Sequence, residues 1–379
     1  MNYILFEYDH GGINNIIISF KFIVFLASIT NRTIVIPPAQ PIDHVNFELN
    51  NTGENTILSS TKLDDLLDFE SDVSFRNLVN IISFNDFIKN ESTNLNLPSN
   101  FNNFNRIESD YQTMLVQGNR LYNKKDARGK YWLQRAETLK LSPDISSNKD
   151  WVIYSIKNFK TMGRSNVEPF LQNILKLKDK VIFFPMDVNI YTIGYKFPRI
   201  FDLVSNYIPK LDTYRYLWTE INSLSYHNKY LCNIVDSIQK EFLNEPYDAL
   251  HYRNKEFPQK LKLNDSQILQ KISKYTSNSS SKLLYIATDN YDQIFNEKTI
   301  SKYPTKIISI KDIPISKYLN NIKLLPLIEL IICIRSNIFI GTNHSTFTSE
   351  IFNNRLHKYC IHWKLGDFIN NDPNNYLIN

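Results

Sequence analysis

A stretch near the C-terminus could hold an anion. It reads NIFIGTNHSTFTSEIF, an apolar strand that ends at Gly341 and is followed by a predicted helix over Phe347–Phe352. Ser345 and Thr346 then lie at the helix N-terminus, and Thr348 adds a third hydroxyl close by. Hydroxyls and unpaired backbone N–H groups at such a position can receive a phosphate. Taken alone, the pattern is equally typical of ordinary N-capping.

A second candidate is His251-Tyr252-Arg253, at the end of a predicted strand. The period of two along a strand sends His251 and Arg253 to the same face. An arginine suits a diphosphate because its fork of donors meets two oxygens at once and it stays charged. A strand-end pair that forms structural salt bridges is the alternative interpretation.

A third candidate is the turn between the first strand and the first helix, which reads Gly11-Gly12-Ile13-Asn14-Asn15. Paired glycines let the backbone approach a ligand closely, and the two carboxamides stand in the first helical turn. A tight strand-to-helix turn without a ligand is the competing explanation.

Glu329 is out of place in the run LLPLIELIICI, where nearly all its neighbours are Leu or Ile. An ionised carboxylate is seldom buried without a partner. A guanine ring, whose N1–H and N2–H₂ donors lie side by side, is one suitable partner. A solvent-exposed helix face is the alternative.

Alternating strands and helices must position these residues. The N-terminal part predicts a β-α-β unit, the seed of a parallel sheet, with its strands at 3–8 and 32–38 and its helix at 13–30. The C-terminal part predicts strands at 247–253, 281–289, 305–310 and 336–341 and helices at 265–276, 290–298 and 324–335. In such sheets ligands bind beyond the carboxyl ends of the strands. All four candidates fall close to such ends or on the helices that follow.

The segment from about 40 to 240 is harder to interpret. It is polar and rich in asparagine at first, with predicted helical pieces at 61–69 and 83–88, a buried strand at 179–187 and one long helix or two over 215–243. A chain of 379 residues is long enough for two domains. We therefore predict an α/β architecture of two Rossmann-like domains, one at 1–240 and one at 241–355, with 356–379 packing back on the first.

Composition narrows the class of function. The formal net charge of +5 fits a small anionic ligand at least as well as nucleic acid, and we find no basic stripe with interleaved aromatics. Cys232, Cys333 and Cys360 have no metal-ligand spacing and are interpreted as reduced thiols. Polar residues interrupt the apolar stretch at 13–29, which favours a buried helix over a membrane span. With no apparent secretory signal, we expect a cytoplasmic protein.

Taken in order, GGINN with NRTIVIPP, then HYRNKEF, LLYIATD and ELIICIRSNIFIGTNHSTFTSEI resemble the protein O-fucosyltransferase family. The first pair is similar to the Gly-Gly-Leu-Asn start and NRTLVLPP strand of that family. HYR is similar to its His-x-Arg motif, and the last segment to its motif ending in Ser-Thr-Phe. The resemblance covers roughly 3–70 and 247–352.

The resemblance implies a GT-B fold, in which two Rossmann-like domains face a central cleft. It also implies GDP-fucose as donor, inverting transfer to a Ser or Thr hydroxyl, and no metal or other cofactor. Arg253 would hold the β-phosphate and Glu329 the guanine. As catalytic residues the resemblance implies Arg253 and Asn14; as donor-binding residues it implies Gly11, Gly12, Ile13, His251, Glu329, Ser345, Thr346 and Phe347.

The sequence departs from the family pattern where some members carry a general base. Those members place a glutamate just before the Gly-Phe-Asn turn, and here that position is Gly11. Glu7, Asp9 and His10 are the nearby groups that could accept a proton. The acidic residue expected after His-x-Arg is represented only by Glu256.

Two further functions stay open at this point. One is a fucosyltransferase that acts on glycans, or a transferase that uses another GDP-sugar. The other is a protein without activity that keeps the nucleotide-sugar pocket as a binding module. Slow hydrolysis of GDP-fucose by water distinguishes an active enzyme from such a module.

Overall fold

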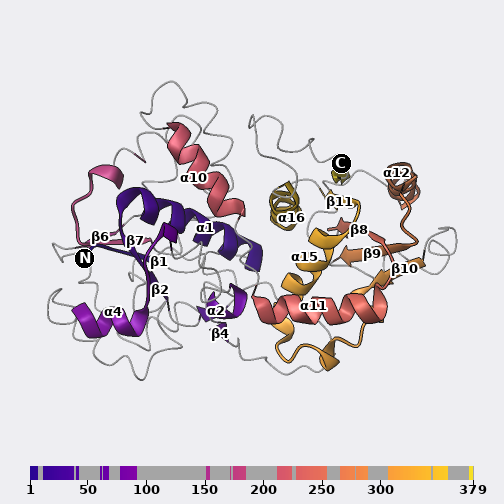
Figure 1. The fold of residues 1–379 in the computed structure, drawn as a ribbon, viewed down its shortest axis with the longest axis horizontal. Coiled ribbons are helices and arrows are strands. Elements are labelled where there is room, and N and C mark those ends of the chain that lie inside the picture. Colours follow the sequence, from indigo (N-terminus) through magenta and orange to yellow (C-terminus); the bar gives the residue numbers. More distant parts are fainter. Residues whose placement is uncertain are drawn as a thin grey trace, which may run out of the picture. The chain divides into compact units, whose positions relative to one another are not determined.

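The chain folds into two compact units, Met1–Leu224 and Ser225–Asn379 (Figure 1). The structure is a computed structural model. It describes residues 1–6, 12–37, 40–41, 60–61, 63–67, 77–91, 151–153, 171, 174–184, 211–223, 228–253, 265–277, 279–288, 306–342, 345–356 and 375–378.

The first unit contains a five-stranded parallel sheet in the order β5-β2-β1-β7-β6. Its strands are β1 (Tyr3–Phe6), β2 (Thr33–Ile36), β5 (Ile81–Ser83), β6 (Trp151–Ile153) and β7 (Val181–Phe184). Helix α1 (Ile13–Thr30) connects β1 to β2, which pair in parallel. This confirms the predicted β-α-β unit and the strand predicted at 179–187. The short strands β5 and β6 were not predicted.

Helix α1 is buried nearly all round, which confirms the predicted buried helix. By length and composition it could cross a membrane, but 78% of its 18-residue apolar window is buried inside the protein. Phe22 and Phe25 meet Trp218 edge-on, at 6.2 and 5.8 Å between ring centroids. Trp218 belongs to α10 (Leu211–Ser223), which therefore covers one side of α1. The helix ends at Asn31, which has a left-handed φ of 50° and donates its N–H to the carbonyls of Ala27 and Ser28.

Smaller elements complete the described part of this unit. The predicted helical pieces at 61–69 and 83–88 correspond to α2 and α4, the second of which is longer than predicted. Ser83 begins α4 as its side chain accepts the N–H of Asp86 and donates to the Asp86 carboxylate. The elements are β3 (Gln40–Pro41), β4 (Ser60–Thr61), α2 (Leu63–Leu66) and α4 (Phe84–Glu91).

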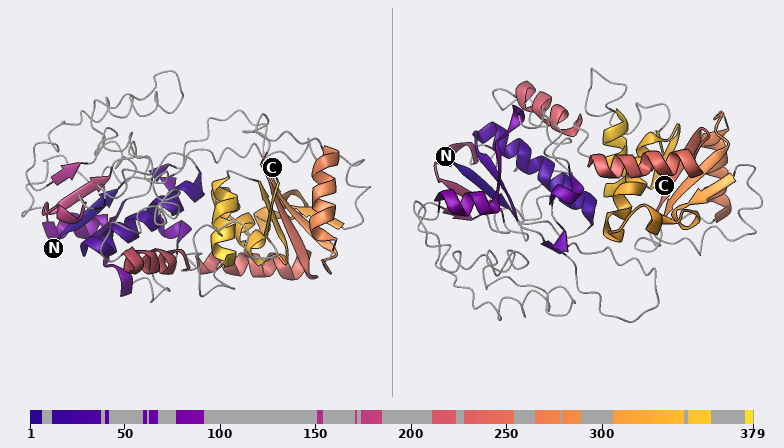
Figure 2. Two further views of the ribbon diagram at one scale, coloured as in Figure 1. Left: turned by 90° about the horizontal axis from the view of Figure 1, so that it is seen from above. Right: turned by 60° about the horizontal axis from the view of Figure 1, so that its bottom comes forward.

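The second unit contains another five-stranded parallel sheet, in the order β10-β9-β8-β11-β12 (Figures 1 and 2). All four strands predicted from the sequence are present. The strands are β8 (Tyr247–Tyr252), β9 (Leu283–Thr288), β10 (Lys306–Ser309), β11 (Phe339–Thr342) and β12 (Asn375–Ile378). We expect residues 356–379 to pack on the first unit, and this stays a prediction. Within the described part of this segment, β12 pairs with β11, because its backbone completes the open edge of that strand.

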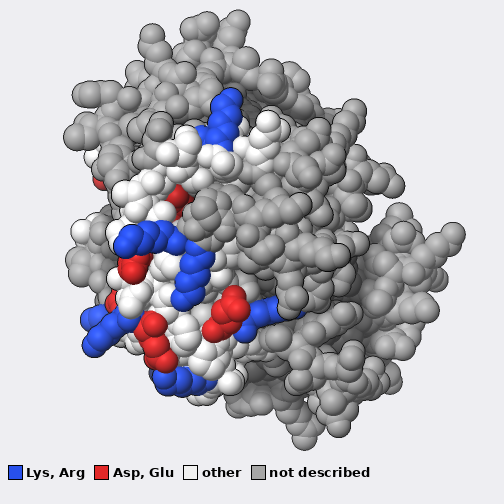
Figure 3. All heavy atoms as spheres, turned by 90° about the vertical axis from the view of Figure 1, so that its right-hand side faces the viewer, with Lys and Arg blue, Asp and Glu red and all other residues white. Residues whose placement is uncertain are grey.

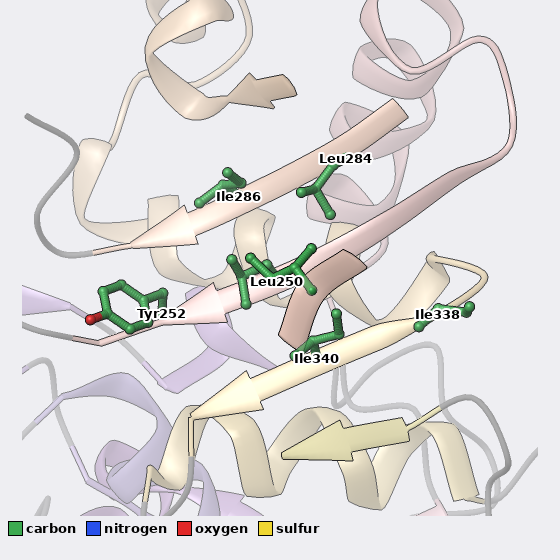
Figure 4. Close-up of a cluster of buried hydrophobic side chains, with 7 residues drawn as sticks. Leu250, Tyr252, Leu284, Ile286, Ile338 and Ile340 are labelled. Carbon is green, nitrogen blue, oxygen red and sulfur yellow. The ribbon is translucent and has the colours of Figure 1, made fainter. Parts of the chain in front are cut away.

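Helices lie on both faces of this sheet, as a doubly wound fold requires. On one face α11 packs against α15, and α15 packs against α16. On the other, Ile272 of α12 joins a cluster of side chains from β8, β9 and the start of β11, six of which Figure 4 shows along the three neighbouring strands. The helices are α11 (Lys229–Phe242), α12 (Asp265–Thr276), α15 (Leu325–Arg335) and α16 (Thr346–Leu356), with short 3-10 turns η5 (Ile310–Asp312), η6 (Ile315–Lys317) and η7 (Ile322–Leu324).

The division between the units differs from the predicted one. The sequence over 215–243 forms two helices, α10 and α11, and the units divide between them at Leu224 and Ser225. The predicted boundary at 240 leaves α11 with the first unit. The buried face of α11, formed by Leu231, Ile234, Val235 and Ile238, packs against α15 of the second unit.

The buried guanidinium of Arg355 holds the turn between α15 and β11. One of its nitrogens donates to the carbonyls of Ile334 and Ser336, at 3.2 and 2.5 Å, and the other to that of Asn337 at 2.8 Å. Arg355 stands in the last turn of α16 and is only 4% exposed. It therefore fixes α16 to the strand that precedes it.

Charged side chains of both signs are interspersed on the surface of the second unit in Figure 3. Lys317 lies 2.9 Å from Glu241, and Arg335 lies 2.6 Å from Asp236. Within the described residues visible in that view, the basic groups do not form a continuous stripe.

Candidate active site

His251 joins the end of strand β8 to the start of helix α16. Its Nδ1 lies 2.8 Å from the hydroxyl oxygen of Thr348. Its ring packs against that of Phe347, with 4.5 Å between centroids and 35° between planes. The parallel strands β8 and β11 end at the same edge of the sheet, with His251 beside Gly341, and α16 follows β11. The His-x-Arg motif and the Ser-Thr-Phe motif therefore meet at one place.

The environment of His251 keeps its ring neutral. The side chain is 7% exposed, and burial, followed by the positive charge of Arg253, lowers its pKa from 6.5 to about 3. Both effects disfavour the protonated form. A ring with so low a pKa is a hydrogen-bonding group and a weak base at neutral pH.

This pKa predicts a pH dependence of stability. Between pH 6.5 and about 3 the unfolded chain binds a proton at His251 and the folded chain does not. The free energy of unfolding should therefore fall as the pH falls through this window, by about 1 kcal/mol per pH unit. Denaturant unfolding at pH 7.5 and 5.5 tests this, with His251→Gln as the non-titrating reference. The contribution of His251 is refuted if both proteins lose the same stability on acidification.

Thr342 fixes the backbone on both sides of the strand end. Its hydroxyl donates to the carbonyl of His251 at 2.9 Å and accepts the backbone N–H of Arg253 at 3.0 Å. Both His251 and Thr342 are buried, whereas Arg253 is half-buried. The backbone on either side of Tyr252, just before the Arg253 side chain, is thus anchored to β11.

Gly341 has a steric reason to be glycine. A Cβ built on it would lie 2.3 Å from the γ-methyl of Thr348 and 2.9 Å from its hydroxyl oxygen. Because this separation is too short for any side chain, Thr348 can sit over β11 and reach His251 only if position 341 carries none. The glycine of the motif therefore determines where Thr348 lies.

The N-terminus of α16 carries a buried hydroxyl. Ser345 immediately precedes the helix and is 3% exposed. Its backbone carbonyl accepts the N–H and the hydroxyl of Ser349. Within the described part of the chain, the Ser345 side-chain oxygen has no hydrogen-bond partner. A buried hydroxyl seldom stays unsatisfied, so this one is suited to a ligand oxygen beside the helix N–H groups.

The first unit carries the other candidate residues. Gly12 is the N-cap of α1 and supplies no side-chain cap, and Asn14 stands in the first turn. Asn14 is buried, and its side-chain oxygen has no hydrogen-bond partner among the described residues. Ile13 is part of the core, being 2% exposed. Asn14 therefore has a polar group available for a ligand at the carboxyl end of β1.

Glu329 is buried, so the exposed-face alternative is wrong. It is 5% exposed in the middle of α15, and the hydroxyl of Tyr285 on β9 donates to its Oε1 at 3.2 Å. The carboxylate also contributes, after burial, to raising the pKa of the Cys333 thiol one turn later. The sequence predicts that this buried carboxylate has a partner, and the hydroxyl of Tyr285 is one.

The structure brings together the predicted residues of the second unit around His251: Arg253, Phe347 and the start of α16. It adds Thr342, which we did not predict, and gives Thr348 a definite contact. The sequence could have pointed to Thr342 only if the register between β8 and β11 had been known. Gly11, Glu7, Asp9, His10 and Glu256 lie outside the described residues, as do Cys360 and the helix predicted at 290–298.

Comparisons with known proteins agree with this arrangement. Among solved structures, POFUT1 in its apo form aligns over 100% of this chain and 97% of its own with a TM-score of 0.53 and 13% identity. POFUT1 in complex with GDP-fucose gives 0.51 and 14% over the same shares. These likenesses establish a GT-B fold. No curated protein matches the sequence.

A family model extends the agreement from fold to sequence. The model described as GDP-fucose protein O-fucosyltransferase matches residues 3–358, which cover most of both units and every candidate site residue above. The protein is therefore a glycosyltransferase and belongs to the GDP-fucose protein O-fucosyltransferase family.

Proposed function

We propose that this protein transfers fucose from GDP-fucose to a Ser or Thr hydroxyl of a protein, with inversion and without a metal ion. The observation that carries the proposal is the contact of His251 with Phe347 and Thr348. Arg253 follows His251 by two residues and its charge acts on that ring, which supports a common site for the arginine and the N-terminus of α16. Solved POFUT1 structures hold GDP-fucose and GDP, which supports the choice of donor.

The chemistry of the leaving group explains the residue types. The bond between the sugar anomeric carbon and the β-phosphate oxygen breaks, and its electron pair stays on the departing GDP. Arg253 and the N–H groups at the start of α16 supply fixed positive potential for that charge. The hydroxyl of Ser345 can donate to a phosphate oxygen in the same place. These groups do the work that a metal ion does in other transferases, which supports the metal-independent proposal.

The acceptor oxygen forms its bond to the anomeric carbon from the opposite face and loses its proton. His251 is a poor candidate for that proton, since its pKa is about 3 and its Nδ1 already contacts Thr348. Asn14 has its side-chain oxygen available to orient the sugar or the acceptor. We assign no general base among these residues.

Glu329 is proposed to accept the N1–H and N2–H₂ groups of guanine. Such a site selects guanine because adenine and the pyrimidines do not offer two adjacent donors in the same pattern. The hydrogen bond from Tyr285 to Oε1 holds the carboxylate in one orientation. Glutamate here, in place of the aspartate usual in the family, extends the reach by one methylene.

A thermal-shift panel tests the donor assignment. GDP should raise the unfolding temperature by several degrees, since a ligand at 100 times its dissociation constant adds about 2.7 kcal/mol. UDP, ADP and CMP at the same concentration should not, and a chelator should leave the GDP shift unchanged. An equal response to all four nucleotides contradicts the role of Glu329. Loss of the shift with chelator contradicts metal independence.

Hydrolysis of GDP-fucose tests whether the protein is active. An enzyme with this site should slowly release GDP and fucose in water, whereas a binding module retains the donor intact. Transfer to a Ser- or Thr-containing acceptor domain and to a free glycan, measured in parallel, distinguishes the two acceptor classes. Release of free fucose whose first anomer is opposite in configuration to the sugar bond of the donor would support inversion.

A further inference from the structure

Thr348 makes a contact that its place in the motif does not require. It is the third residue of α16 and only 2% exposed, and its hydroxyl oxygen lies 2.8 Å from Nδ1 of His251. The two residues are 97 positions apart in the chain. A threonine near a helix start that served only as a cap would bond to its own helix.

Two neighbours restrict how these side chains can move. Phe347 lies against the face of the imidazole, which limits tilting of the ring. Gly341 leaves room for the γ-methyl of Thr348 directly over β11. The ring can still rotate about the bond that joins it to Cβ. The hydrogen bond between Nδ1 and the Thr348 hydroxyl restrains that rotation. The second ring nitrogen, Nε2, then faces away from Thr348.

A neutral imidazole carries one proton shared between two nitrogens. A hydroxyl can donate to Nδ1 or accept from it, so the contact with Thr348 holds the orientation of the ring in either tautomer. A ring without that partner can flip, which exchanges nitrogen and carbon positions, and then presents a carbon where Nε2 should stand for part of the time. The free energy needed to return the ring to its binding orientation then lowers the apparent affinity for the ligand.

We propose that Thr348 is a positioning residue for nucleotide binding: its hydroxyl holds the His251 ring in one orientation, so that Nε2 is presented to the donor. The inference rests on the proposed function, in which His251 lies against the nucleotide. Thr348 itself acts through His251 and does not touch the donor.

The main test compares Thr348→Val with Thr348→Ser by calorimetric titration with GDP. Valine keeps the shape and removes the hydroxyl, so the dissociation constant should rise about tenfold, the effect of one lost buried hydrogen bond. Serine keeps the hydroxyl and should stay within about twofold of wild type. Thr276→Val is the matched control, because the Thr276 hydroxyl bonds to the Ile272 carbonyl of its own helix, α12. It should leave GDP binding unchanged.

Coupling to His251 distinguishes positioning from a general loss of packing. In a His251→Gln background, Thr348→Val should change the dissociation constant by less than about twofold, since the group it positions is gone. In steady-state transfer the Thr348→Val variant should raise KM for GDP-fucose with little change in kcat. Full additivity of the two substitutions overturns the inference.

Nitrogen-15 spectra of the histidine rings give a readout that needs no variant. The ring nitrogens of wild-type His251 should give the signals of one ring orientation, and Thr348→Val should show exchange between two orientations. Exchange between orientations in the wild type overturns the inference. If wild-type protein binds GDP and Thr348→Val binds it equally well, the inference alone fails. If wild-type protein does not bind GDP, the proposed function fails and the inference fails with it.

Discussion

Arg253→Ala should lower the rate of fucosyl transfer by roughly a hundredfold or more. Removing one preorganised group that faces a developing negative charge typically costs about 3 kcal/mol of transition-state stabilisation. Arg253 follows β8 directly, and Thr342 holds its backbone. Its charge acts on His251, which contacts the start of α16. Transfer from GDP-fucose, measured as kcat and KM separately, provides the test.

Two further variants make this test specific. Arg253→Lys keeps the charge and loses the fork of donors, so its rate should lie between those of the alanine variant and the wild type. Lys311→Ala removes an exposed cation from η5 of the same unit and should leave transfer unchanged. Near-normal turnover by Arg253→Ala in a folded protein would remove the arginine from the mechanism.

Arg355→Met should be the most destabilising of the substitutions considered, by about 3–5 kcal/mol. The guanidinium is 4% exposed and donates to the carbonyls of Ile334, Ser336 and Asn337. Methionine fills much of the volume but leaves these buried acceptors without a donor, and each such loss costs about 1–3 kcal/mol. Equilibrium unfolding in denaturant measures the effect.

Arg335→Met is the matched control on the same turn. Arg335 ends α15 and pairs with Asp236, whose side chain is 62% exposed. A pair that water can reach contributes about 1 kcal/mol or less. The structural role assigned to Arg355 is wrong if the two methionine variants lose equal stability.

Local patterns predicted most of the elements in the second unit. The strands at β8, β9, β10 and β11 and the helices at α12 and α15 follow from runs of apolar residues whose period and length are characteristic. The helix at α1 was predicted as a buried helix because polar residues interrupt its apolar stretch too often for a membrane span. By contrast β6 and β12 are short and have neighbours far away in the chain, so their sequences alone carry little signal.

The candidate site likewise has residues that the sequence predicted and contacts that it did not. The types of residue needed to bind a diphosphate could be read from the chain, as Arg253 after a strand and Ser345 before a helix. The contact of Tyr285 with Glu329 could not be predicted from the sequence, because it depends on how α15 packs on the sheet. The division of the units at Leu224 and Ser225 likewise depends on which helix α11 packs against.

Motifs and periodicity are local properties of the chain, so the family, the order of strands and helices and the chemical types of the site residues could be predicted from the sequence. The contacts of His251 with Thr348 and Phe347, and the need for a glycine at position 341, follow from how the strands and helices pack. The contact of His251 with Thr348 joins residues 97 positions apart, and it exists because the parallel strands β8 and β11 are neighbours in the sheet and end at the same edge.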